Sequence, residues 1–83
     1  MDEILERINT VEKQIASIKN KQAYMDLRQM LKPIDRTVTE MSKEDVVCRQ
    51  MKKTTIRYQE LEHTAKELLT NLEQMVTFAA LLS

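Results

Sequence analysis

The sequence predicts an all-α protein, and its composition and its pattern both point to this fold class. The 83 residues include no Gly and one Pro, so the tight turns with positive φ that β-hairpins need are hard to build. Residue types that favour helices (Glu, Lys, Gln, Leu, Met and Arg) are abundant. Apolar or small residues recur every three or four positions, which is the spacing of one stripe along an α-helix. A chain of this length is expected to form a single domain over residues 1–83.

The first helix is predicted over residues 2–31. Its apolar stripe starts with β-branched side chains, which are Ile4, Ile8, Val11, Ile15 and Ile18. β-Branched residues at both seam positions of a heptad favour three or more helices in contact over a parallel two-stranded coiled coil. After Ile18 this frame turns polar at Gln22 and Gln29, and a second apolar frame begins at Leu27. The pattern indicates a bundle in which the neighbours of this helix change along its length.

A joint is predicted between residues 32 and 42. Pro33 disfavours the α conformation of Lys32 and would lack a hydrogen bond in mid-helix, so we expect it to open a short helix over residues 33–41. Ser42, with Asp45 three residues later, resembles a capping box that starts a new helix. A long helix is therefore expected over residues 43–82. The joint would give either a helical hairpin or a bent helical rod with heptad seams.

The long helix is predicted to associate with other chains. Its stripe consists of Val47, Met51, Thr54, Tyr58, Leu61, Ala65, Leu68, Leu72, Met75, Ala79 and Leu82. Over residues 68–82 the apolar residues exceed one stripe, and such a surface is seldom left in water, so we expect a multi-helix bundle completed by other chains. The residues expected to carry this assembly are Ile4, Ile8, Val11, Ile15, Ile18, Met51, Tyr58, Leu61, Leu68, Leu72, Met75 and Leu82.

Charge is balanced overall but unevenly distributed along the chain. Residues 1–18 carry two basic and four acidic groups, residues 19–57 carry ten and five, and residues 58–83 carry one and four. Within the basic segment, Arg49, Lys52, Lys53 and Arg57 form a ridge that could meet an acidic protein tail, RNA, a phospholipid surface or a charged polymer. A solvated helix face is the alternative interpretation. No aromatic residues interleave with the ridge to stack on bases, which argues against nucleic acid.

Catalytic and cofactor patterns are missing from the sequence. A phosphate-binding loop needs glycines, and the chain has none. The single cysteine, Cys48, and the single histidine, His63, are too few for a zinc site. On one helix they would lie about 22 Å apart, too far for a nucleophile and its base. We therefore expect no enzyme, no cofactor, no metal and no small-molecule substrate.

The expected function is that of a non-catalytic subunit that scaffolds a complex of helical chains, in a trafficking, tethering or cytoskeleton-linked assembly. A hetero-complex is favoured over a homo-oligomer. The alternatives are a self-oligomerising module or helix-binding chaperone, and a nucleic-acid-associated factor that uses residues 49–57. One cysteine suggests a reducing compartment, and no stretch resembles a signal peptide or is apolar for the ~20 residues that span a bilayer. We expect a cytoplasmic or nuclear protein that does not insert into membranes.

Overall fold

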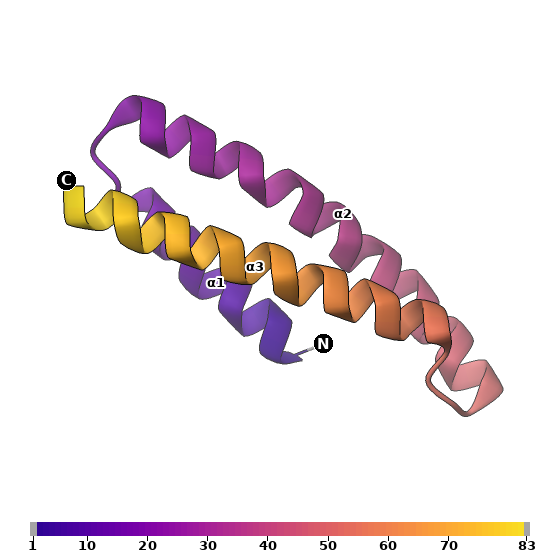
Figure 1. Cartoon of the computed structure of the whole chain (residues 1–83). Helices are drawn as coiled ribbons and strands as arrows, with labels where there is room; N and C mark the ends of the chain where they lie inside the picture. The colour runs from indigo at the N-terminus through magenta and orange to yellow at the C-terminus, as the bar shows by residue number, and fades with distance from the viewer. Residues whose placement is uncertain (1, 83) are drawn as a thin grey trace.

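The computed structural model describes residues 2–82 and contains, within them, three α-helices and no β-strand. The helices are α1 (Asp2–Ala16), α2 (Lys21–Met51) and α3 (Ile56–Leu82). α2 and α3 form a long antiparallel hairpin, and α1 runs beside α3 in the same direction, along the part of the hairpin that is remote from the α2–α3 loop (Figure 1). The molecule is a rod of 48 × 16 × 15 Å. The all-α prediction is confirmed.

The first helix ends at Ala16, so the prediction of one helix over residues 2–31 was wrong. Ser17 closes α1 because its side-chain hydroxyl donates a hydrogen bond of 2.7 Å to the carbonyl oxygen of Gln14. Asn20 then adopts an extended backbone (φ −70°, ψ 117°), and its side-chain oxygen accepts a hydrogen bond of 2.9 Å from the N–H of Ala23. This is a helix N-cap. The change of apolar frame after Ile18 therefore marks a reversal of the chain.

α2 passes through both residues that were expected to interrupt it, so the joint at residues 32–42 and the separate helix over 33–41 were also wrong. Pro33 removes a backbone hydrogen bond, which costs about 3 kcal/mol in a helix interior. However, Leu31, Ile34 and Met41 are buried on the same helix, and each buried side chain contributes roughly 1.5–3 kcal/mol. Burial against the rest of the bundle therefore outweighs the local cost of the proline.

The chain instead turns at residues 52–55, inside the long helix that was predicted over residues 43–82. Lys52 adopts the left-handed conformation (φ 57°, ψ 34°), and its N–H donates a hydrogen bond to the carbonyl oxygen of Arg49. Thr55 caps α3, because its hydroxyl oxygen accepts a hydrogen bond of 3.1 Å from the N–H of Tyr58. The same hydroxyl donates to Glu44 Oε2 at 2.7 Å, which ties the start of α3 to α2.

One apolar core joins the three helices. Its buried members are Ile4, Ile8, Val11, Ile15, Ile18, Leu27, Leu31, Ile34, Met41, Ala65, Leu69, Leu72 and Val76. No residue from 42 to 64 is fully buried. The loop end of the rod is therefore a two-helix hairpin without a third helix over it, and the opposite end carries the core.

Candidate functional site: two exposed surfaces

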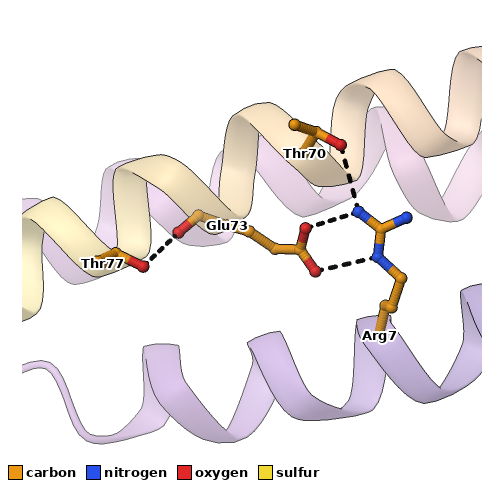
Figure 2. Close-up of polar contacts among 4 residues, drawn as sticks. All are labelled: Arg7, Thr70, Glu73 and Thr77. Atoms are coloured by element: carbon orange, nitrogen blue, oxygen red, sulfur yellow. Dashed lines mark hydrogen bonds and ion pairs between the residues drawn. The ribbon is translucent and has the colours of Figure 1, made fainter.

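The position of α1 decides which apolar residues of α3 remain exposed, and a polar contact helps to fix that position. The Arg7 guanidinium contacts both carboxylate oxygens of Glu73, at 2.6 Å and 3.1 Å, and its Nη2 donates to Thr70 Oγ1 at 3.3 Å (Figure 2). The hydrogen bond to Glu73 is the main cause that raises the pKa of Arg7, against a smaller opposing effect of burial. Since both side chains remain partly exposed, this pair contributes only about 0.5–1 kcal/mol.

The first predicted assembly set lies in the chain's own core. It comprises Ile4, Ile8, Val11, Ile15 and Ile18, none of which is more than 8% exposed. Their spacing correctly indicated a buried stripe. Their contact with a second chain stays a prediction, and it would require α1 to leave the bundle.

The predicted set on residues 51–82 is divided between the core and the surface. Leu72 is fully buried, whereas Tyr58, Leu61 and Leu68 are half-buried. Met51, Met75 and Leu82 are exposed by 52%, 50% and 74%.

Between residues 65 and 79, the stripe of α3 that faces the core differs from the predicted one at two positions. Leu69 and Val76 are fully buried, in the places that the predicted seam gave to Leu68 and Met75. Each buried residue is the immediate sequence neighbour of the residue it replaces, so the stripe is rotated by roughly 100° at those positions. The sequence holds a signal for both residues only in the broad apolar composition of residues 68–82.

The C-terminal apolar surface is formed by four large side chains of α3, namely Met75, Phe78, Leu81 and Leu82. They are exposed by 50%, 60%, 80% and 74%. Beside them a groove of about 450 Å³ runs between the end of α3 and the start of α2, where Ala23, Leu27 and Met30 line it. A second groove, of about 400 Å³, lies on the other side of Phe78 and is lined by Thr77 and Leu81. Phe78 therefore stands as a ridge between two grooves.

The basic ridge lies at the opposite end of the rod, around the α2–α3 loop. Arg49 forms an ion pair with Asp45 at 2.9 Å, and Arg57 approaches Glu40 at 3.7 Å. Lys52 and Lys53 lie in the loop, and neither forms an ion pair with any residue that the structure describes. The four predicted cations are thus brought together, with two of them partly neutralised by acids on α2.

Two further polar groups, the thiol of Cys48 in α2 and the phenol of Tyr58 in α3, lie close to this loop. The thiol of Cys48 is half-buried and accepts a hydrogen bond of 3.5 Å from the N–H of Thr55. Burial raises the pKa of the Tyr58 phenol, and the nearby carboxylates of Glu62 and Asp45 add to the effect. The hydrogen bond to Cys48 thus connects α2 to Thr55, the residue that caps α3.

His63 and the acidic residues provide no metal site within the described part of the chain. His63 is exposed and pairs with Glu67 at 2.9 Å. Among residues 2–82, no three His, Cys, Asp or Glu side chains are placed so that they could hold a metal ion. None of the helices in that range is both long and apolar enough to cross a membrane. Comparison with protein-family models, with curated proteins and with solved structures gave no match.

Proposed function

We propose that the chain is a non-catalytic helical subunit, and that its C-terminal apolar surface binds other helical chains. The observation that carries this proposal is the exposure of Met75, Phe78, Leu81 and Leu82, by 50–80%, at one end of one helix. Large contiguous apolar patches on soluble proteins typically mark interaction sites. The two grooves beside Phe78 offer the holes into which side chains of a partner helix can pack.

The strength of this contact follows from the side chains that it would cover. Fully burying one large apolar side chain is worth about 1.5–3 kcal/mol, so covering these four, which are 50–80% exposed, would contribute on the order of 5 kcal/mol. Association itself costs about 4–15 kcal/mol. The partner's own apolar side chains would have to supply the remainder, by packing into the groove between the end of α3 and the start of α2.

The cellular setting of the proposed complex follows from the cysteine content and from the kind of subunit proposed. We place it in a reducing compartment, the cytoplasm or the nucleus, because the chain carries a single free thiol, Cys48. A trafficking, tethering or cytoskeleton-linked assembly is proposed because small helical subunits are common in such complexes.

The test is a double substitution on the C-terminal apolar surface, Phe78→Asp with Leu81→Asp. Both side chains are more than half exposed, so the variant should keep its helical circular dichroism spectrum. Substitution of Leu72 would be uninformative, because that side chain is 0% exposed and its loss would disrupt the chain's own core. A matched control, Gln59→Asp with Thr64→Asp, adds the same charge at exposed positions on the same helix.

The readouts are absolute mass by light scattering over a concentration series and covalent cross-linking to partners in cells. We expect the Phe78 and Leu81 variant to lose the oligomer or the cross-linked partners, and the control to keep them. A stable homo-oligomer of the wild type would favour the self-oligomerising alternative, whereas a monomer with cross-linked partners would favour the hetero-complex. If the variant retains every partner and its full mass, the C-terminal apolar surface is not the binding site.

A further inference from the structure

We infer that the α2–α3 loop forms a second interaction surface, and that its partner is an anionic phospholipid membrane. This surface, called the loop tip below, comprises Val47, Met51 and Ile56 together with Lys52 and Lys53. It lies at the opposite end of α3 from the C-terminal apolar surface (Figure 1). The inference is independent of the proposed function, because the two surfaces share no residue.

Apolar side chains are exposed at the loop tip. Ile56 begins α3 and is 74% exposed, while Met51 ends α2 and is 52% exposed. Val47 lies one helical turn before Met51 and is 37% exposed. The loop between α2 and α3 closes one end of a narrow rod (Figure 1). Apolar side chains at such an end can enter a soft, deformable phase such as the interfacial region of a bilayer.

The chain around the loop tip is also basic. Residues 43–57 carry five basic and two acidic groups. Asp45 pairs with Arg49, and Glu44 accepts a hydrogen bond from Thr55 in the loop, so the segment keeps a net charge of +3. The two loop lysines, by contrast, have no ion-pair partner among the described residues. They are free to contact anionic headgroups, where each basic residue contributes roughly 1 kcal/mol, or about fivefold in affinity.

The combination of these features favours a membrane over RNA or an acidic protein. RNA would engage the lysines but would leave Met51 and Ile56 in water, and no exposed aromatic residue at the loop tip can stack on a base. An acidic peptide would likewise satisfy only the charge. At a lipid surface, Met51 and Ile56 enter the boundary between headgroups and acyl chains, while Lys52 and Lys53 extend back to the phosphates. With so few apolar residues this contact is peripheral and reversible.

The first experiment uses a fluorescent reporter. The chain contains no Trp, so Ile56→Trp places a single indole at the loop tip, and Gln29→Trp places one at an exposed position of α2 remote from it. With vesicles of phosphatidylcholine and phosphatidylserine, we expect the emission of the Ile56→Trp protein to shift to shorter wavelength and to be quenched by brominated acyl chains. The Gln29→Trp protein should show neither change. Equal behaviour of the two reporters, or no change in either, would overturn the proposed orientation.

The second experiment separates a local contact from general charge attraction. Lys52→Glu with Lys53→Glu should lower vesicle binding by at least 25-fold, since two basic residues contribute about fivefold each. Lys19→Glu with Lys21→Glu alters the net charge by the same amount at the other end of the rod, and should have little effect. Met51→Ser with Ile56→Ser keeps every charge and should also weaken binding. Circular dichroism confirms that each variant is folded.

Three results would each overturn the proposed contact between the loop tip and an anionic membrane. If both lysine pairs weaken binding equally, the attraction is nonspecific. If neutral phosphatidylcholine vesicles bind as well as anionic ones, the lysines have no role. If the loop tip binds polyuridylate or polyglutamate more tightly than vesicles, and the serine variant binds as well as the wild type, the partner is RNA or an acidic protein. The variant Phe78→Asp with Leu81→Asp changes only the C-terminal apolar surface, so each molecule of it should bind vesicles with the same affinity as the wild type.

Discussion

Replacing Lys52 by Gly should stabilise this protein. Lys52 is the only non-glycine residue with positive φ in the described part of the chain. The left-handed conformation costs an L-residue with a Cβ roughly 1–2 kcal/mol. Glycine removes that cost, but it gains conformational entropy in the unfolded chain, which offsets about 0.4–1 kcal/mol. The expected net effect is an increase of about 1 kcal/mol in the free energy of unfolding.

Urea denaturation followed by circular dichroism, at one fixed protein concentration, measures this change. For a domain of this size, about 1 kcal/mol corresponds to a rise of roughly 4–8 °C in Tm. Lys52→Ala is the matched control, because it removes the same charge and keeps the Cβ. Lys53→Gly tests the neighbouring position, where φ is negative, and it should not stabilise the fold. If Lys52→Ala gains as much as Lys52→Gly, relief of charge repulsion is the cause, and the reasoning from backbone conformation is refuted.

Two further predictions concern α2 and the loop. Pro33→Ala should raise the free energy of unfolding by about 1–3 kcal/mol, because alanine restores a backbone N–H inside α2 and removes the clash of the proline ring. Urea denaturation measures the change. A loss of stability would show that packing of the proline ring matters more. Burial raises the pKa of Tyr58 above 10.0, so the folded state keeps the phenol proton after the unfolded state has lost it. The free energy of unfolding should therefore be unaffected by Tyr58 below this pH and should fall as the pH rises above it. Tyr58→Phe should reduce that fall, and denaturation curves of equal alkaline slope for both proteins would contradict the assignment.

The sequence was a good guide to the helices and a poor guide to where they end. Pro33 and Ser42 are strong local signals, yet both lie inside α2, because the burial of Ile34 and Met41 outweighs their local preferences. The real turns carry weaker signals. Asn20 is a good N-cap residue but is surrounded by helix formers, and Lys52 occupies a conformation that glycine usually marks.

The apolar stripes illustrate a second limit of sequence reasoning. The stripe that begins with Ile4 and Ile8 is the main apolar face of α1, so the spacing of its residues identified the buried side of that helix. Residues 68–82 are apolar on several faces, and spacing alone selects Leu68 as readily as Leu69. The helices that pack on α3 decide which of these two residues is buried. One of them is α1, where Arg7 pairs with Glu73 of α3. Such a contact between residues 66 positions apart cannot be derived from a local pattern.

The two proposed surfaces have a geometric consequence for any complex that contains this chain. One surface lies at the C-terminal end of α3 and the other at its start, on a rod 48 Å long (Figure 1). A partner helix seated beside Phe78 would not cover Lys52 or Ile56, and contact of the loop tip with a lipid surface would leave the grooves beside Phe78 open. Since sites this far apart with no shared residue act nearly independently, the chain could engage both partners at once. It would then hold a protein assembly away from a membrane by about the length of the helical hairpin, which is the arrangement that a tethering subunit requires.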